Sequence, residues 1–161
     1  MFEECALDPE RHDRNGFSCG VPVLDDYLKR YAVQHRRKGI STVYVLVESA
    51  APALILGYYT LSAAQLDAAG LSPADQAGLP RFPVPCIRMG RLACRTDRKG
   101  QGLGKLLVGG AVTRCVDARK QIAAYAMVVD AKDETAKKFY EHYGFKSCTD
   151  SPLTLYLPFG R

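Results

Sequence analysis

The chain has 161 residues, of which 47% are hydrophobic and 24% charged, and its formal net charge is +5 at pH 7. A chain of this length buries roughly 70% of its unfolded surface on folding, which is enough for a stable core without disulfides. Together with the absence of repeats and low-complexity tracts, this predicts one globular domain over residues 1–161 and excludes a disulfide scaffold.

The six cysteines are scattered without a C-x-x-C pair, and the three histidines do not stand at zinc-ligand spacing with them. We therefore expect reduced thiols and no metal. The first residues are charged and lack the apolar core of a signal peptide. No apolar run is long enough to cross a membrane. These features predict a cytoplasmic protein without a membrane partner.

Positive charge is concentrated in two stretches. Residues 29–38, KRYAVQHRRK, carry five cations and no acid, and residues 88–105 carry six cations against the single acid Asp97. Such stretches suit a polyanionic partner, either nucleic acid or the phosphates of a cofactor. The alternative is a solvated basic face that keeps the protein soluble, and composition alone favours this alternative.

The hydrophobic pattern predicts the following elements in chain order. A helix over 23–32 places six residues on one buried face, namely Val23, Leu24, Tyr27, Leu28, Tyr31 and Ala32. Strands over 42–48 and 55–62 form an antiparallel pair, and a short helix over 73–77 precedes a strand over 86–94. A helix over 103–118, a strand over 124–131, a helix capped by Asp133 and ended by Gly144, and a strand over 151–159 follow. This order predicts a mixed α/β (α+β) domain with a crossover in its second half.

Residues 91–107, RLACRTDRKGQGLGKLL, join a strand to a helix through three glycines at alternate positions. The stretch matches neither the phosphate-binding P-loop nor the dinucleotide fingerprint. A basic turn, glycines and a helix N-terminus are nevertheless typical of an anion-binding site, because free N–H groups and the helix dipole favour a pyrophosphate. The alternative is a tight turn that holds no ligand.

Two motifs carry a family resemblance. KGQGLG, residues 99–104, resembles the acetyl-coenzyme A motif of the GCN5-related N-acetyltransferases (the GNAT family), with Lys99 where Gln or Arg is usual. DETAKKFYEHYGF, residues 133–145, resembles the second signature of that family, with Asp133 where Asn is commoner. The resemblance implies a single GNAT domain with a central mixed, largely antiparallel sheet flanked by helices. It also implies acetyl-CoA as co-substrate, without a metal.

A narrower resemblance concerns the stretches FSCGVPVLDDYL, LGYYTLS, MGRLAC and FYEHYGF. They are similar to the GNAT toxins of bacterial toxin–antitoxin systems. This likeness implies a homodimeric toxin that acetylates the α-amino group of aminoacyl-tRNA, inhibits translation and is neutralised by a ribbon-helix-helix antitoxin. Two alternatives stay open: a GNAT enzyme for a small-molecule or protein amine, and a binding module that keeps the cofactor site without turnover.

The same resemblance implies the cofactor contacts. Backbone groups of the strand meet the pantetheine arm, the glycine loop holds the pyrophosphate, and the second motif lies along the thiol end. The residues concerned are Leu92, Ala93 and Cys94, then Lys99, Gly100, Gln101, Gly102, Leu103, Gly104 and Lys105, and finally Asp133, Ala136 and Phe139. Asp133 in place of Asn weakens one expected hydrogen bond to the pantetheine.

Tyr140 is the candidate general acid, because a phenol is protonated at neutral pH and can donate to a departing thiolate. The alternative is a core aromatic on a helical face. No general base stands out, since we expect Glu141 and His142 on the solvent face of the helix. Cys94 could carry an acyl group, but a small strand residue is the preferred interpretation.

Three arginines are candidate contacts to the tRNA, namely Arg36, Arg37 and Arg91. Arg91 serves equally well, from the sequence alone, as a structural ion-pair partner.

Overall fold

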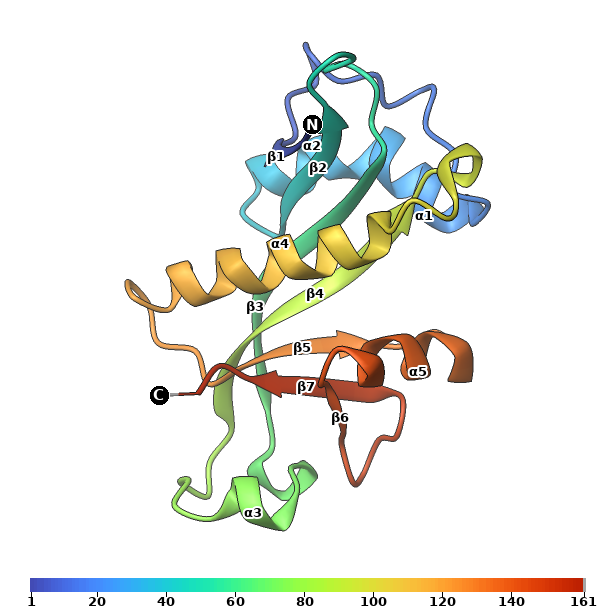
Figure 1. The fold of residues 1–161 in the computed structure, drawn as a ribbon. Coiled ribbons are helices and arrows are strands. Elements are labelled where there is room, and N and C mark those ends of the chain that lie inside the picture. Colours follow the sequence, from blue (N-terminus) through green and yellow to red (C-terminus); the bar gives the residue numbers. More distant parts are fainter. Residues whose placement is uncertain (161) are drawn as a thin grey trace. The chain divides into compact units, whose positions relative to one another are not determined.

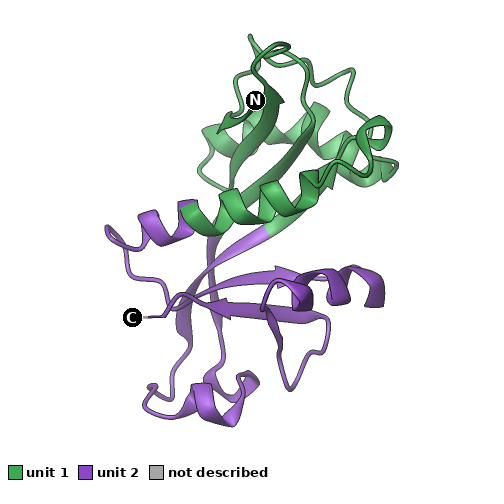
Figure 2. Ribbon diagram, in the orientation of Figure 1, with its two compact units in different colours: residues 1–62, 90–113 green, residues 63–89, 114–161 purple. Residues whose placement is uncertain are grey.

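The computed structural model describes residues 1–160, and the chain forms two compact units (Figure 2). Unit 1 comprises Met1–Ser62 and Gly90–Thr113, and unit 2 comprises Ala63–Met89 and Arg114–Arg161. Because chain segments of both units alternate in the sequence, neither unit is one continuous stretch. The single domain expected over residues 1–161 stays a prediction.

Seven strands carry the fold, with helices between them (Figure 1). The strands are β1 (Phe2–Ala6), β2 (Thr42–Glu48), β3 (Gly57–Leu66), β4 (Val84–Cys94), β5 (Ala126–Asp130), β6 (Lys146–Ser147) and β7 (Thr154–Pro158). The α-helices are α1 (Pro22–Asp26), α2 (Ala32–Arg37), α3 (Pro73–Gln76), α4 (Leu103–Ala118) and α5 (Glu134–His142). A π-helix, η1 (Tyr27–Tyr31), and two 3₁₀ turns, η2 (Ala68–Gly70) and η3 (Thr96–Arg98), complete the elements.

The hydrogen-bonded order of the strands is β1-β2-β3-β4-β5-β7-β6. Strands β4 and β5 pair in parallel, as a crossover connection through a helix requires. The pairs β1–β2, β2–β3, β5–β7 and β6–β7 are antiparallel. The predicted mixed, largely antiparallel sheet flanked by helices is therefore confirmed. No helix between residues 1 and 160 combines the length and apolar composition that a membrane span needs.

The predicted elements all exist, and the strand over 42–48 and the helix over 103–118 have the predicted bounds. The hydrophobic pattern did not predict two of the strands, β1 and β6. Strand β1 has the sequence FEECA, whose two adjacent glutamates hide the strand periodicity, yet it pairs with β2 over its whole length. Strand β6 has two residues, too few for any periodicity to appear.

The first helix is longer than predicted and is interrupted by the π-turn η1. The N–H of Ala32 bonds the carbonyl of Tyr27, five residues back, so the helix face shifts at this point. Tyr31, predicted to be buried, is therefore 44% exposed, while Tyr27, Leu28 and Ala32 are buried as predicted. Val23 was also predicted to be buried and is 77% exposed, since it lies in α1, none of whose residues is buried.

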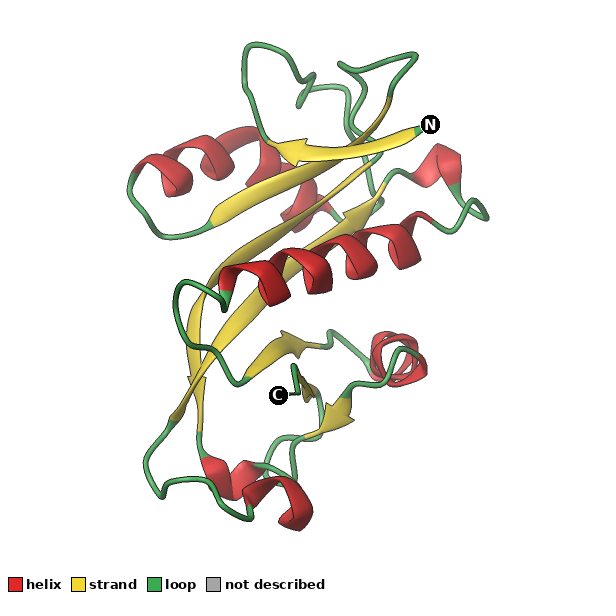
Figure 3. Cartoon of the chain, turned by 60° about the vertical axis from the view of Figure 1, so that its left-hand side comes forward, coloured by secondary structure: helices red, strands yellow, loops and turns green. Residues whose placement is uncertain are grey.

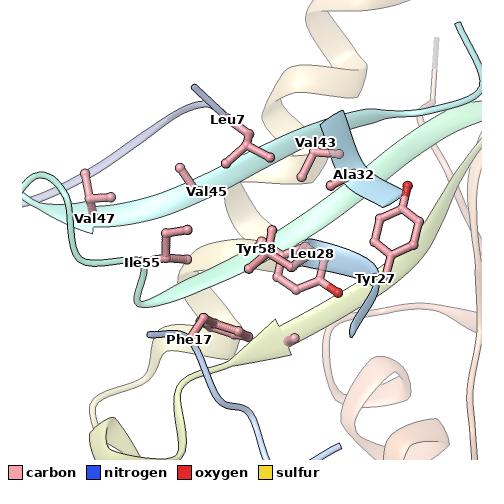
Figure 4. Close-up of a cluster of buried hydrophobic side chains, with 11 residues drawn as sticks. Leu7, Phe17, Tyr27, Leu28, Ala32, Val43, Val45, Val47, Ile55 and Tyr58 are labelled. Atoms are coloured by element: carbon pink, nitrogen blue, oxygen red, sulfur yellow. The ribbon is translucent and has the colours of Figure 1, made fainter. Parts of the chain in front are cut away.

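The core of unit 1 lies between strands β2 and β3 and the helix of residues 22–37 (Figure 4). Val43, Val45 and Val47 alternate along β2 and point into this cluster, as a half-buried strand requires. Tyr58 of β3 joins it, and its hydroxyl donates to the Leu24 carbonyl at 2.6 Å. These contacts hold the first helix against one face of the strands.

Helix α4 packs against the other face of the same strands (Figure 3). Gly57 and Tyr59, which flank Tyr58 in β3, point to this side. A side chain at Gly57 would come within 2.7 Å of Leu107 Cδ1 and 2.8 Å of the Ala93 carbonyl oxygen. Only hydrogen fits there, so the absence of a side chain at Gly57 lets α4 approach the sheet closely.

The core of unit 2 contains Val84, Cys86, Ala126, Val128 and Tyr156 from β4, β5 and β7, with Leu71 and Cys148 beside them. The Tyr156 hydroxyl donates to Asp75 Oδ2 at 2.7 Å and accepts the Ser72 N–H at 2.9 Å. These bonds attach the short helix α3 to strand β7.

Two adjacent glycines of α4 differ in their surroundings, which gives a stability test. Gly109 is exposed with open space around it, whereas the Glu4 carboxylate lies directly on Gly110 and also accepts a hydrogen bond from the Tyr59 hydroxyl. We expect Gly109→Ala to stabilise the protein by about 1 kcal/mol, since alanine favours the helix. Gly110→Ala gains the same helix propensity, but its methyl group must displace Glu4, so we expect it to be about 1–3 kcal/mol less stable than Gly109→Ala.

Urea unfolding of both variants beside the wild-type chain measures these effects. Each variant serves as the other's control, since both add one methyl group to the same helix. Equal shifts of the two unfolding midpoints would contradict the packing of Glu4 on Gly110.

Candidate functional site

The end of strand β4 is anchored to neighbouring segments of unit 1. Ala93 is buried, and Leu92 and Cys94, the other two residues predicted to face the pantetheine, are half-buried. After Cys94 the chain leaves the strand but stays attached, because the Arg95 N–H donates to the Leu56 carbonyl at 2.8 Å. The next N–H, that of Thr96, donates to the Ser18 carbonyl at 3.0 Å. The turn that follows therefore starts from a fixed position.

The glycine loop has the backbone conformation that its glycines permit. Gly100 has φ +84° and Gly102 has φ +71°, in the left-handed region that L residues with side chains disfavour. A side chain at either position would meet nothing within 4 Å, so conformation rather than space requires glycine. Lys99, Gln101 and Lys105 are exposed along the same loop. The loop thus presents its backbone and two ammonium groups to solvent.

Helix α4 begins directly after this loop, at Leu103. Its first backbone hydrogen bond runs from the Leu106 N–H to the Gly102 carbonyl, at 3.1 Å. The N–H groups of Leu103, Gly104 and Lys105 precede that bond and have no partner within the helix. Sixteen aligned residues add a positive dipole end at the same place. The arrangement fits a pyrophosphate held by backbone N–H groups and the lysines.

Arg98 does not take part in this arrangement. The Arg98 guanidinium lies 3.6 Å from the Glu48 carboxylate, and Arg95 pairs with Asp97 at 2.9 Å. Both pairs are structural contacts of the turn, which leaves Lys99 and Lys105 as the cations of the loop.

Helix α5 of unit 2 carries the second motif. Asp133 is its N-cap, as the sequence predicts, and its Oδ1 accepts the Ala136 N–H at 2.8 Å. This cap gives Asp133 a structural role, so its contact with a pantetheine arm stays a prediction. Ala136 and Phe139 are half-buried one turn apart on the helix.

Tyr140 is 7% exposed and is held by aromatic neighbours within unit 2. Its ring meets Phe139 and Phe145 edge-on, with centroids 5.3 and 5.5 Å away. Its carbonyl accepts the N–H groups of Tyr143 and Phe145, which turns the chain after the helix. Tyr140 therefore has the fixed position that a proton donor needs. Glu141 and His142 are exposed, as the sequence predicts.

Cys94 does not have the environment of a nucleophile. Burial raises the pKa of its thiol above the usual value, which lowers the thiolate fraction at neutral pH. A cysteine–histidine pair occurs elsewhere, with Cys5 Sγ 3.6 Å from His12 Nε2. The Asp8 N–H donates to His12 Nδ1 at 2.9 Å, so the neutral ring carries its proton on Nε2 and cannot accept one from Cys5.

The three arginines predicted to contact tRNA have different environments in unit 1. Arg36 Nη1 donates to the Leu7 carbonyl at 2.5 Å, which connects α2 to the residue that follows strand β1. Arg37 is exposed and lines a pocket. The Arg91 guanidinium lies over the Tyr27 ring, 3.5 Å from its centroid. This cation–π contact gives Arg91 a structural role within unit 1.

The sequence missed three residues that line the same pocket as Arg37, namely Arg14, Arg30 and Lys38. Arg30 and Lys38 belong to the basic stretch 29–38, and this concentration of positive charge was the feature of the sequence that could have identified them. Arg14 comes from a distant loop and carries no signal in the sequence. Residues 1–160 contain no group of three or more histidine, cysteine or acidic side chains placed to bind a metal.

The chain is similar in sequence to known acetyltransferases. Residues 74–154 match the family model described as acetyltransferase (GNAT) domain. The chain is 34% identical to the tRNA-acetylating toxin of Mycobacterium tuberculosis (strain ATCC 25618 / H37Rv) over 145 residues, which cover 90% of this chain and 85% of that protein.

Two solved structures are also similar. AtaT complexed with acetyl-methionyl-tRNAfMet has a TM-score of 0.91 and 28% identity, over 98% of this chain and 95% of that one. A tyrosine-to-phenylalanine mutant of the AtaT toxin, bound to the C-terminus of the antitoxin AtaR and to acetyl-CoA, has a TM-score of 0.82 and 26% identity. That match covers 98% of this chain and 93% of that one.

The positive φ of Gly102 makes the loop testable. A side chain there costs about 1–2 kcal/mol in the left-handed region, so Gly102→Ala should distort the loop. We expect its Kd for coenzyme A to rise about tenfold, measured by isothermal titration calorimetry. Gly109→Ala is the control, since Gly109 is an exposed glycine outside the loop, has open space around it and has no positive φ. Equal Kd values of the two variants for coenzyme A would contradict a role of the glycine loop in binding the cofactor.

Proposed function

Because this chain belongs to the GNAT family of acetyl-CoA-dependent N-acetyltransferases, we propose that it is the toxin of a toxin–antitoxin system and acetylates the α-amino group of aminoacyl-tRNA. The observation that carries this proposal is the likeness to AtaT in complex with acetyl-methionyl-tRNAfMet, over 98% of this chain. The acetylated amine can no longer form a peptide bond, which would inhibit translation.

The proposal assigns a role to each part of the chain. In unit 1, the backbone of Leu92, Ala93 and Cys94 binds the pantetheine arm. The pyrophosphate binds to Lys99, Gly100, Gln101, Gly102, Leu103, Gly104 and Lys105. In unit 2, Asp133, Ala136 and Phe139 contact the pantetheine and thiol end. The open backbone of the loop and the first N–H groups of α4, which have no partner within the helix, support the pyrophosphate assignment.

In the proposed reaction, acetyl-CoA supplies the acetyl group as a thioester. The neutral α-amine of the aminoacyl ester attacks the carbonyl carbon, so that a C–N bond forms and the C–S bond breaks. The Tyr140 hydroxyl donates its proton to the departing sulfur, and the attacking nitrogen loses a proton to solvent. An α-amine has a pKa of roughly 8 or below, so part of it is neutral near pH 7 without a protein base.

Direct transfer is favoured over an acyl-cysteine route. Burial raises the pKa of the Cys94 thiol, and the neutral His12 ring beside Cys5 cannot accept its proton. Arg37 and Arg91 remain the proposed tRNA contacts, together with Arg36, whose guanidinium also bonds Leu7.

The proposed partners follow from the relatives. The mutant AtaT toxin is bound to the C-terminus of its antitoxin AtaR, which supports an antitoxin for this chain. The ribbon-helix-helix type of that antitoxin and a homodimeric toxin are further parts of the proposal, and they rest on the family resemblance. Its proposed location is the cytoplasm, where aminoacyl-tRNA is found.

Tyr140→Phe tests the general acid, since it keeps the ring contacts and removes the proton. We expect kcat to fall by about 10²–10⁴-fold while the Kd for coenzyme A stays near the wild-type value. Tyr143→Phe is the matched control, because Tyr143 lies next to the same helix and its ring also meets Phe139 edge-on. Wild-type turnover by Tyr140→Phe would refute the assignment.

The substrate class is tested with labelled acetyl-CoA and four acceptors: aminoacylated tRNA, deacylated tRNA, a peptide mixture and small polyamines. We expect label only in aminoacylated tRNA, and its release with the amino acid when the ester bond is hydrolysed at alkaline pH. Label in the peptides or polyamines alone would support the alternative, a GNAT enzyme for a protein or small-molecule amine.

A further inference from the structure

Arg95 differs in burial from the other cations of the turn and the glycine loop. Its side chain is 15% exposed, against 31% for Arg98, while Lys99 and Lys105 are exposed residues. A guanidinium that is taken out of water needs polar partners, because its desolvation is otherwise costly. The contacts of Arg95 therefore indicate what this cation does in the fold.

The Arg95 residue connects two segments of unit 1. Its Nε lies 2.9 Å from Asp97 Oδ1, within the 3₁₀ turn η3. Its Nη1 donates to the Ile55 carbonyl at 3.4 Å, and its backbone N–H donates to the Leu56 carbonyl at 2.8 Å. Ile55 and Leu56 are fully buried and lie directly before β3. Arg95 thus attaches η3 to a part of the chain that belongs to the core.

Turn η3 is the segment between β4 and the glycine loop. The backbone bond that closes this turn runs from the Arg98 N–H to the Arg95 carbonyl and is long, at 3.4 Å. The contact between Arg95 and Asp97 closes the same turn through side chains. Because Gly100 follows soon after with a positive φ, the conformation of η3 sets the direction in which the glycine loop begins.

The loop before α1 holds the turn from a second segment. The Thr96 N–H donates to the Ser18 carbonyl at 3.0 Å. A side chain at Gly20, which has φ +83°, would come within 3.2 Å of Thr96 Cγ2. The backbone of η3 is therefore fixed by Ser18 and by the residues before β3, and the Arg95 side chain links it to the latter.

We propose that Arg95 is a positioning residue for the pyrophosphate of coenzyme A. It fixes η3 through Asp97 and so keeps residues 99–105 in the conformation that binds the anion. The inference rests on the proposed role of that loop. A loop that is ordered before binding loses less conformational entropy, which raises its affinity for the ligand. In this proposal Arg95 itself makes no contact with the anion, since its guanidinium is engaged by Asp97 and Ile55.

The charge of Asp97 distinguishes positioning from simple electrostatics. An acid near an anion site repels the anion, so Asp97→Asn should lower the Kd for coenzyme A if charge alone mattered. Under the positioning proposal the same variant loses the ionic contact with Arg95 and loosens η3. The Kd then rises. The two explanations therefore predict opposite signs for one substitution.

The test measures the Kd of coenzyme A for the full chain by isothermal titration calorimetry. We expect Arg95→Ala and Asp97→Asn each to raise the Kd about fivefold to tenfold, the effect of one lost hydrogen bond between charged groups. Arg95→Lys keeps the charge and should recover part of the affinity. The double variant should bind no more weakly than Arg95→Ala, because both substitutions remove the same contact.

Lys120→Ala is the control for net charge, since Lys120 is an exposed cation of unit 2 and its loss changes the total charge as Arg95→Ala does. Its Kd for coenzyme A should equal that of the wild-type chain. Urea midpoints show whether each variant is folded at the temperature of the titration. If Arg95→Ala does not fold, Arg95→Lys and Asp97→Asn provide the same comparison.

Turnover separates a positioning role from a merely structural one. The Arg95 and Asp97 variants should raise the KM for acetyl-CoA, while kcat at saturating acetyl-CoA and the KM for the acceptor stay near the wild-type values. A contact that only stabilises the fold would lower the urea midpoint and leave the Kd of the folded protein unchanged. That second result would refute the proposal.

Further outcomes distinguish this proposal from the assignments on which it rests. If Gly102→Ala weakens coenzyme A binding and the Arg95 and Asp97 variants do not, the loop binds the cofactor but Arg95 does not position it. If none of these variants changes the Kd, the loop assignment fails and the positioning role fails with it. A lower Kd for Asp97→Asn would show that charge alone governs the site. If the Kd pattern holds but no aminoacyl-tRNA is acetylated, the proposed acceptor is wrong and the role of Arg95 stands.

Discussion

The buried ring of Tyr27 fixes the helix of residues 22–37, whose C-terminal part is basic, against the strands of unit 1. Its hydroxyl shares hydrogen bonds with Ser41 Oγ at 2.7 Å and with His35 Nδ1 at 3.1 Å, which joins the helix to the start of β2. Its ring stacks near Tyr58 of β3, with an interplanar angle of 14°. Since the helix cannot rotate without breaking these contacts, residues 30–38 are held with their cations towards the loop after β1.

On the other face of the unit 1 strands, the packing of α4 depends on its close approach to β3 rather than on one anchoring side chain. Helix α4 lies near β3 because Gly57 carries no side chain at the contact with Leu107, and the Glu4 side chain of β1 occupies the space beside Gly110. The Tyr59 hydroxyl holds that carboxylate in place. As a result the N-terminus of α4 is fixed close to the end of β4, and the connecting loop turns sharply between them. Its positive-φ glycines, Gly100 and Gly102, allow this short connection.

The sequence predicted the helices and strands whose hydrophobic pattern or capping residue lies within one short segment. The strand over 42–48 and the helix over 103–118 show their periodicity within one segment, and Asp133 caps its helix through a contact three residues away. The π-turn at 27–31 was not predictable, because it changes the backbone bond from Ala32 to Tyr27 while the hydrophobic spacing still predicts a regular helix. The loop of the candidate site was recognisable from its motif. The pocket was not, since Arg14 reaches it from a segment that no helical or strand period connects to residues 30–38.

Arg91 shows why a structural role and a binding role need not exclude each other. In the sequence, the choice lay between an ion-pair partner and a tRNA contact. In the structure the guanidinium lies over the Tyr27 ring, with Cζ 3.5 Å from its centroid, and a guanidinium in such a contact can still direct N–H groups to an acceptor. The stacking lowers the entropy lost when those donors meet an acceptor, because the side chain is already ordered. The contact with Tyr27 therefore also orders the Arg91 side chain, which is compatible with the proposed contact to tRNA.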